Sequence, residues 1–432
     1  MTMTNALSKD RTKNAGRRKL QVSIAAVSLL AGCSNGTAPT SPALPPPVPS
    51  NATAYIGTQA PGLWTMSVDT AQNLFSYQSQ AAGAVAVSGG LLTRNGVLDF
   101  GNASGAALGR AVAQPAGGAL LRPGGESTYP VAMVQQSGCV PVTGSLRYIY
   151  ARIMNSVRQG AEQSDTGYGT FVVSASSDAT TWNFTDLHNY VLTSFSSGYA
   201  AGTENGSDPG SFAATCSATD KQGAVTASAN DAFPVDSTNS PSLPTFHFNP
   251  GGAFIEDRNN GISWAGFVMP QAAIKSSDVR AQTYRGFVFE GTPSAPIDTR
   301  TVAFAAPGSG TATLAGGVFP NEDLTAIPLQ QYTMALGTPD ASLNGVFPNA
   351  KFTAQDVNAY CSTVALSDPS VTESLDVNGN AVCTALGVAV VGQIGGKYVV
   401  YFISRDGTKQ VGADGITGAN SSYVIQFYLY QQ

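Results

Sequence analysis

Residues 388–404 read VAVVGQIGGKYVVYFIS, and no other stretch after residue 33 comes closer to the length of a membrane span. A spanning helix needs about 20 consecutive apolar residues, and Gln393, Lys397 and three glycines interrupt this stretch. Its second part, residues 398–404, is rich in aromatic and β-branched residues and begins one residue after the pair Gly395-Gly396. Asp406-Gly407, a dipeptide that favours tight hairpin turns, comes next. The stretch therefore predicts a β-strand at 398–404 that ends in a turn.

The same signals recur along the chain. Further strands are predicted at residues 63–68, 74–78, 171–175, 287–290 and 423–430. Further turns are predicted at Asn95-Gly96, Asn260-Gly261, Asn344-Gly345 and Asn378-Gly379. Helical signals are few: Thr353 with Asp356 predicts a short helix near 354–364, and residues 146–157 fit either a strand or a helix. The predicted fold is mainly β, in two halves, with antiparallel meanders that form a barrel, a sandwich or a propeller-like body.

Domain boundaries are indicated by a change in composition. Residues 217–252 are rich in Ser, Thr, Asn, Asp and Pro, which predicts a linker or long loop between a β-rich domain at 55–216 and another at 253–432. One domain with a long ordered insertion is the alternative. The motif Gly-Val-Phe-Pro-Asn at 317–321 recurs at 345–349, although two copies do not make a repeat protein. Gly62-x-Trp64 resembles the first strand of lipocalin-like barrels.

The N-terminus has the pattern of an export signal. Six of the 22 Lys and Arg residues, but one of the 27 acidic residues, precede Cys33. A short apolar segment at 20–31 follows this basic region, as in a secretory signal peptide. Leu30-Ala31-Gly32-Cys33 resembles the lipobox of bacterial lipoproteins. The resemblance implies cleavage after residue 32, attachment of diacylglycerol to the Cys33 thiol and, because Ser34 rather than Asp follows, sorting to the outer membrane.

The segment after Cys33 predicts a tether. Residues 34–54 are rich in Pro, Ser, Thr and Asn and have no apolar periodicity, so we expect a semi-rigid extended spacer. The mature chain of 400 residues would carry 16 basic and 26 acidic residues, a net charge of −10. This acidic balance argues against nucleic acid as a partner. The lipid anchor makes the membrane the first expected partner, and the second is an unknown ligand or envelope component.

Four cysteines remain after Cys33: Cys139, Cys216, Cys361 and Cys383. An even number in an exported protein predicts disulfides. Of the three possible pairings we favour Cys139–Cys216 with Cys361–Cys383, because each pair then closes within one half. Buried free thiols are the alternative.

Catalytic signatures are sparse. His188, in Asp186-Leu187-His188, could be oriented as a general base, but a loop histidine bonded to its neighbours is the commoner situation, and His247 fits a half-buried strand position. No catalytic residue, metal site or cofactor is predicted. Carboxylates such as Glu256, Asp257, Glu322 and Asp323 fit solvated loops, and Trp64, Trp182 and Trp264 fit core packing.

The sequence therefore favours a membrane-anchored lipoprotein with a non-enzymatic binding or envelope-structural role. The alternative is a surface-tethered polysaccharide hydrolase, which would show exposed aromatic residues beside two converging carboxylates. The body resembles proteobacterial lipoproteins of unknown function, and this resemblance implies no activity.

Overall fold

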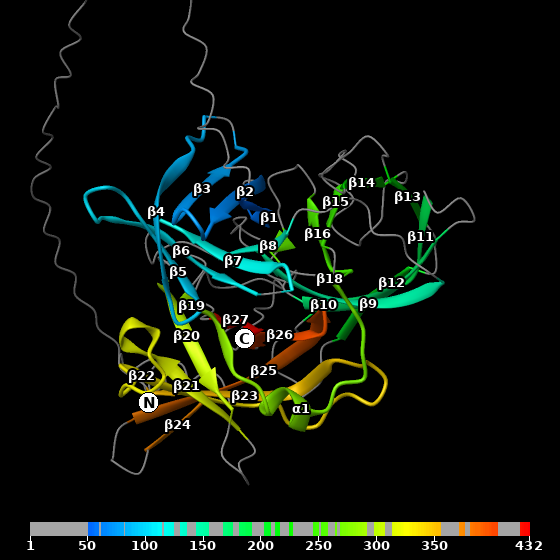
Figure 1. Cartoon of the computed structure of the whole chain (residues 1–432). Coiled ribbons are helices and arrows are strands. Elements are labelled where there is room, and N and C mark those ends of the chain that lie inside the picture. The colour runs from blue at the N-terminus through cyan, green and yellow to red at the C-terminus, as the bar shows by residue number, and fades with distance from the viewer. Residues whose placement is uncertain are drawn as a thin grey trace, which may run out of the picture. The chain divides into compact units, whose positions relative to one another are not determined.

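Antiparallel strands make up nearly all of the regular structure in the computed structural model of this chain (Figure 1). Every described residue belongs to the compact unit Val48–Gln432. The structure describes residues 51–59, 62–81, 83–114, 116–124, 130–135, 144–154, 167–175, 181–191, 203–208, 212–216, 224–227, 245–249, 252–257, 264–265, 268–291, 298–306, 313–355, 371–375, 381–404 and 424–432.

The first sheet, ring 1, is a closed barrel in which each strand pairs with the next and β1 pairs with β8. Its strands are β1 (Thr53–Gln59), β2 (Gly62–Asp69), β3 (Leu74–Ser79), β4 (Val87–Arg94), β5 (Val97–Gly101), β6 (Ala107–Ala113), β7 (Gly118–Pro123) and β8 (Val131–Gln135). Alternate residues point inward, and Phe75 and Phe100 stack there with their ring centroids 4.2 Å apart.

The second sheet, ring 2, is closed because β9 pairs with both β10 and β18. It contains β9 (Ser145–Met154), β10 (Gly167–Ala175), β11 (Thr181–Val191), β12 (Thr203–Asp208), β13 (Phe212–Cys216), β14 (Ala224–Ala227), β15 (Thr245–Phe248), β16 (Phe254–Asp257), β17 (Trp264–Ala265) and β18 (Val268–Pro270). β12 and β17 lie beside the closed path. Aromatic side chains contact one another within it, including Phe171 with Phe184 and Phe184 with Phe246.

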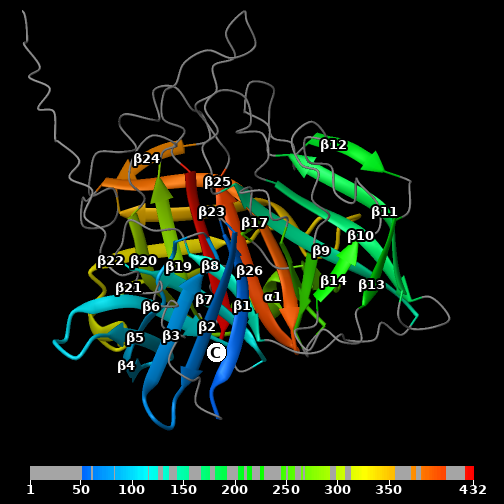
Figure 2. The same cartoon turned by 90° about the horizontal axis from the view of Figure 1, so that it is seen from above.

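The third sheet, ring 3, is closed by the pairing of β23 with β25. It contains β19 (Tyr284–Gly291), β20 (Asp298–Ala305), β21 (Leu314–Val318), β22 (Gln330–Ala335), β23 (Val346–Gln355), β24 (Val371–Leu375), β25 (Ala381–Ile394), β26 (Lys397–Ser404) and β27 (Val424–Gln431). β24 pairs with the first part of β25 beside this path. In Figure 2, ring 1 is drawn in blue to cyan, ring 2 in blue-green to green, and ring 3 from yellow-green at β19 and β20 through yellow and orange to red.

The three rings share an apolar core formed by their outer faces. Ile56 and Val134 of ring 1, Ile149 of ring 2, and Val390 and Tyr401 of ring 3 belong to this one cluster. The tyrosine cluster, defined as Tyr401, Tyr428 and Tyr430, lies in this shared core.

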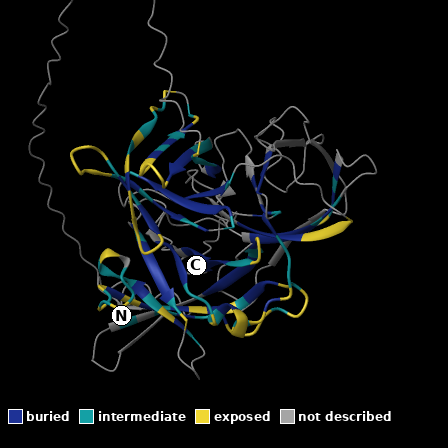
Figure 3. Cartoon of the chain, viewed as in Figure 1, coloured by how far each residue is buried: buried dark blue, intermediate teal, exposed yellow. Residues whose placement is uncertain are grey.

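Stretch 388–404 owes its composition to this arrangement. Val388 and Val390 face the shared core, whereas Ala389 and Val391 face the interior of ring 3. Strands buried on both faces have nearly continuous apolar sequences, because neither face meets water. Figure 3 shows the contrast with β4, whose exposed residues are drawn in yellow.

The predicted mainly β fold of antiparallel meanders with few short helices is confirmed. Of the barrel, sandwich and propeller-like arrangements that the sequence allowed, the strands form barrels. In the described part of the chain the helical elements are α1 (Ser276–Arg280) and the 3-10 helix η2 (Pro320–Glu322). No helix among the described residues is long and apolar enough to cross a membrane. The ambiguous residues 146–154 form most of strand β9.

The short helix predicted near 354–364 is wrong at its start, and residues 356–364 lie outside the described part. Thr353, the expected N-cap residue, lies within β23, where it pairs with Thr384 of β25 and their hydroxyl oxygens are 3.0 Å apart. A cross-strand partner has overridden a local capping signal. The domain boundaries remain a prediction, and the described residues of the predicted linker 217–252 include β14 and β15, which pair with each other in ring 2.

Candidate functional site

The structure describes two of the five cysteines predicted to carry the lipid or to form disulfides. Cys33, Cys139 and Cys361 lie outside the described residues. Cys216 ends β13 opposite Val225 of β14, and Cys383 lies in β25 between β23 and β24. Only the backbone of these two is described, so lipidation and both disulfides remain predictions.

The histidines and tryptophans occupy different environments. His247 lies in β15 as predicted but is buried rather than half-buried. Trp182 is fully buried, with its ring centroid 4.2 Å from that of Phe248. A buried ring cannot stack on a sugar, so Trp182 packs in the core as expected and offers no support for carbohydrate binding. The side chain of Trp264 lies outside the described part.

His188 belongs to a polar group on the outer face of ring 2. Its Nε2 lies 3.0 Å from Oδ1 of Asp186, and the other carboxylate oxygen of Asp186 accepts a hydrogen bond from Arg147 of β9. The Arg147 guanidinium holds the pKa of Asp186 below its usual value, with a smaller contribution from the bond to His188. A carboxylate stabilised in this way stays ionised, and its two oxygens fix the orientation of the His188 ring and of the Arg147 guanidinium.

A β-bulge creates this geometry. Between the pairs Thr170–His188 and Val172–Thr185, two residues of β11 stand opposite the single residue Phe171 of β10. Asp186 takes a left-handed backbone conformation there, with φ 54°. Bulges redirect side chains on sheets, and this one turns the Asp186 carboxylate toward Arg147. The sequence suggested the Asp-x-His contact, but Arg147 lies 39 residues from Asp186 and had no sequence signal.

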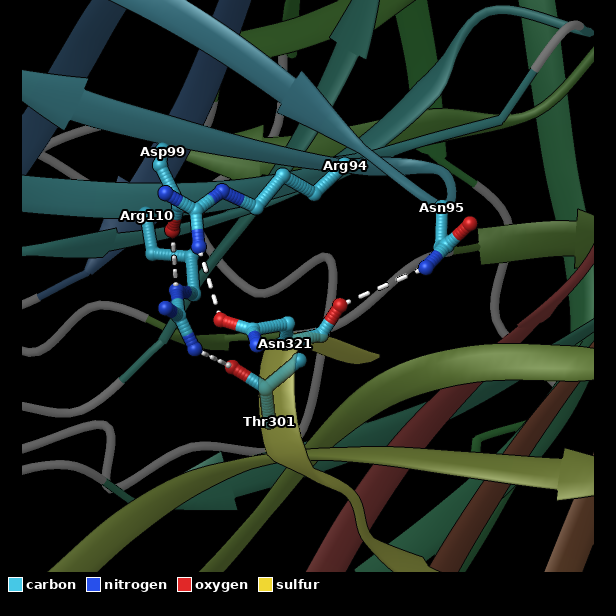
Figure 4. A network of polar contacts seen from close by, with 6 residues as sticks. All are labelled: Arg94, Asn95, Asp99, Arg110, Thr301 and Asn321. Carbon is cyan, nitrogen blue, oxygen red and sulfur yellow. Dashed lines mark hydrogen bonds and ion pairs between the residues drawn. The ribbon is translucent and has the colours of Figure 1, made fainter. Parts of the chain in front are cut away.

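A second group, the polar seam, links ring 1 to ring 3 (Figure 4). Its residues are Arg94, Asn95, Asp99, Arg110, Thr301 and Asn321. Asp99 and Arg110 stand opposite each other on β5 and β6, and Nε of Arg110 donates to Oδ1 of Asp99 at 2.6 Å. Arg110 also donates to the Thr301 hydroxyl of β20 at 2.9 Å. The ion pair of ring 1 is thus bonded directly to ring 3.

The turn between β4 and β5 docks beside this pair. Arg94 donates to the side-chain oxygen of Asn321 at 2.8 Å, and the Asn95 amide donates to the Asn321 carbonyl at 3.3 Å. Arg285 of β19 donates to the Asn95 carbonyl at 2.9 Å. The sequence predicted the turn but not its partners, because Arg94 and Asn321 are 227 residues apart.

Arg122 makes a further contact between these rings. It is almost buried, donates to the Thr299 carbonyl at 2.7 Å and lies over the Phe287 ring, 5.9 Å from its centroid. Guanidinium groups remain protonated at any ordinary pH. These arginines therefore bind and position groups and do not transfer protons.

The candidate carboxylates fall in separate rings. Glu256 and Asp257 belong to β16 of ring 2, whereas Glu322 and Asp323 adjoin β21 of ring 3. Asp323 accepts hydrogen bonds from the backbone and hydroxyl of Thr325, which lower its pKa and close the local turn. Across the described residues, no group of three or more His, Cys, Asp or Glu side chains could hold a metal ion.

No protein-family model matches the chain, and no curated protein matches it. Among solved structures it aligns with two mutant forms of the vaccine antigen Transferrin Binding Protein B from Haemophilus parasuis Hp5. The double mutant aligns with 9% identity and a TM-score of 0.23, over 89% of this chain and 66% of that one. A single mutant gives 8% and 0.22, over 92% and 98%.

Proposed function

We propose that this protein is a lipoprotein, anchored in the outer membrane through Cys33, whose body binds a partner without catalysis. The observation that carries the proposal is Leu30-Ala31-Gly32-Cys33, placed after a basic and then an apolar segment. The predicted spacer is two residues shorter than 34–54, because β1 begins at Thr53, and residues 34–52 would supply it. Lipid chains contribute about 0.8 kcal/mol for each buried CH₂ group, so a multi-chain anchor needs no spanning helix.

The way the rings are filled limits where a partner could bind. Inside ring 1, Phe75, Tyr77 and Phe100 pack against one another, with centroids 4.2–6.2 Å apart. Inside ring 3, Phe402 and Phe427 stack at 4.9 Å. Because aromatic side chains occupy these interiors, a partner would meet exposed outer surface and connecting loops, which is where the group around Asp186 lies.

Metabolic labelling with radioactive palmitate tests the anchor. Label should appear on the wild-type protein, whereas Cys33→Ser should remain unlabelled and should accumulate as the longer precursor. Ala31→Gly, which keeps a small residue next to the cleavage site, is the matched control and should still be labelled. Normal cleavage and labelling of Cys33→Ser would exclude this proposal.

Membrane fractionation tests the location. Ser34→Asp should move the protein from the outer-membrane fraction to the inner-membrane fraction, because Asp after the lipidated cysteine is the usual retention residue. Ser34→Ala should stay with the outer membrane. If wild-type protein sediments with the inner membrane, the outer-membrane location is wrong, although the anchor could still stand.

A further inference from the structure

The connection between β21 and β22, residues 319–329, holds two large aliphatic side chains away from the body. Ile327 is 84% exposed and Leu329 is 71% exposed, with Pro328 between them. Single exposed aliphatic residues are ordinary on protein surfaces. Two of them on one short connection, within an uncharged stretch that runs from 324 to 339, are a concentrated apolar tip.

This apolar tip, defined as Ile327, Pro328 and Leu329, is braced on both sides. Asn321 is bonded to Arg94 and Asn95 of ring 1, as Figure 4 shows. The turn that follows is closed by the bonds from Thr325 to the Asp323 carboxylate.

The far side of the connection returns directly into the sheet, because the Leu329 amide donates to the Val318 carbonyl at 2.7 Å. A connection fixed in this way loses little conformational freedom when it binds. The two aliphatic side chains are thus preorganised for a partner.

The tether decides which partner is nearest. Thr53, where β1 begins, lies 20 positions after Cys33. At about 3.1 Å per residue in an extended Pro-rich chain, the start of β1 stays within roughly 60 Å of the lipid on Cys33. Such a tether keeps the bilayer at a high effective concentration around the body.

Charge favours the same partner. The mature chain has a net charge of −10, so anionic lipid head groups repel most of its surface. Stretch 324–339 carries no charge, and the adjacent Asp323 carboxylate is bonded to Thr325. Ile327 and Leu329 can therefore enter the head-group region without carrying a charge of their own out of water.

We propose that the apolar tip docks on the bilayer in which Cys33 is anchored, with Ile327 and Leu329 inserted into its interface. This contact fixes which face of the body turns away from the membrane. The inference rests on the proposed lipid anchor, and mass analysis of the N-terminal peptide establishes lipidation before the docking is measured.

Fluorescence quenching tests the docking. The lipidated full chain is reconstituted into phosphatidylethanolamine–phosphatidylglycerol vesicles with brominated acyl chains, as Ile327→Trp and, separately, as Val85→Trp. Val85 is the matched control because it is an aliphatic loop residue that is 81% exposed. After subtraction of the wild-type signal, quenching should be at least twofold stronger for Ile327→Trp than for Val85→Trp.

A second variant separates lipid contact from other causes. Amide exchange of residues 324–331 should slow at least threefold on vesicles relative to detergent, and Ile327→Asn with Leu329→Asn should abolish the slowing. Equal quenching at both positions, or unchanged exchange, overturns the docking while the anchor stands. Absence of lipid on Cys33 overturns the anchor and the docking together. Protection of the tip by another protein without bromine quenching identifies a protein-binding surface and also overturns lipid docking.

Discussion

Val390 and Val391 are adjacent in β25, both 0% exposed, and face different cores. Val390 belongs to the core that the rings share, whereas Val391 belongs to the interior of ring 3. Replacement by Ala removes two methyl groups in each case. Lost apolar burial and the resulting cavity should cost about 2 kcal/mol of unfolding free energy at each position. If the outer face of β25 met solvent, Val390→Ala would cost less than about 0.5 kcal/mol.

Urea unfolding of the purified chain, followed by circular dichroism, measures both values. Val85→Ala is the control, since its side chain is 81% exposed and its loss should change the unfolding free energy by less than about 0.5 kcal/mol. A Val390→Ala midpoint equal to that of Val85→Ala, with Val391→Ala clearly destabilised, would refute the shared core. Equal losses at Val390 and Val391 would establish that β25 is buried on both faces.

Three further outcomes are expected. Gly345→Ala should destabilise more than Gly83→Ala in thermal unfolding. Both glycines have φ between 81° and 87°, which costs Ala about 1–2 kcal/mol. A Cβ at Gly345 would in addition lie 2.4 Å from the backbone carbonyl oxygen of Val391, whereas Gly83 faces open space. Equal melting temperatures would contradict the close approach of the turn before β23 to β25. Tyr430→Phe should cost about 1–2 kcal/mol in urea unfolding, because its hydroxyl donates to the Ala119 carbonyl of ring 1 at 3.1 Å, and no loss would contradict that bond. Burial raises the pKa values of the tyrosine cluster well above 10. Above pH 10 the unfolded chain therefore binds fewer protons than the native chain, and the free energy of unfolding should fall by about 1.4 kcal/mol per pH unit for each tyrosine. Constant urea midpoints from pH 9 to 11 would contradict this.

The strand at 398–404 could be predicted because its evidence is local. A run of aromatic and β-branched residues shortly after a Gly-Gly pair has the composition of a strand that follows a turn. The strand forms β26 as expected. Which core each residue faces could not be predicted, because a continuous apolar run carries no alternation from which to read two faces.

The polar seam shows the same limit. Asn95-Gly96 predicted a tight turn, and Asn95 and Gly96 both have positive φ, at 45° and 82°. The bonds of that turn to Asn321 and Arg285 join segments about 190 residues or more apart. No periodicity or spacing encodes such contacts, so the sequence predicted the turn and missed the site that it forms.

The repeated motif Gly-Val-Phe-Pro-Asn shows why local identity was not enough. In its first copy, 317–321, Val318 ends β21 and the rest turns into η2, where Asn321 has φ 52°. In its second copy, 345–349, Val346 begins β23 and the strand continues. Five identical residues therefore adopt two structures.

Both copies nevertheless interrupt a ladder at the same place. The second copy has a bulge between Phe347 and Ala350 that spans its Pro-Asn pair. Proline has no amide hydrogen to donate to a ladder, and asparagine tolerates a left-handed backbone, so this pair disrupts strand pairing in either setting. In the second copy the strand continues after the bulge because β25 provides partners on both sides of it, including Val390 opposite Val346. In the first copy, Asn321 bonds to the β4–β5 turn of ring 1 instead, and the chain leaves the sheet to form the connection that carries the apolar tip.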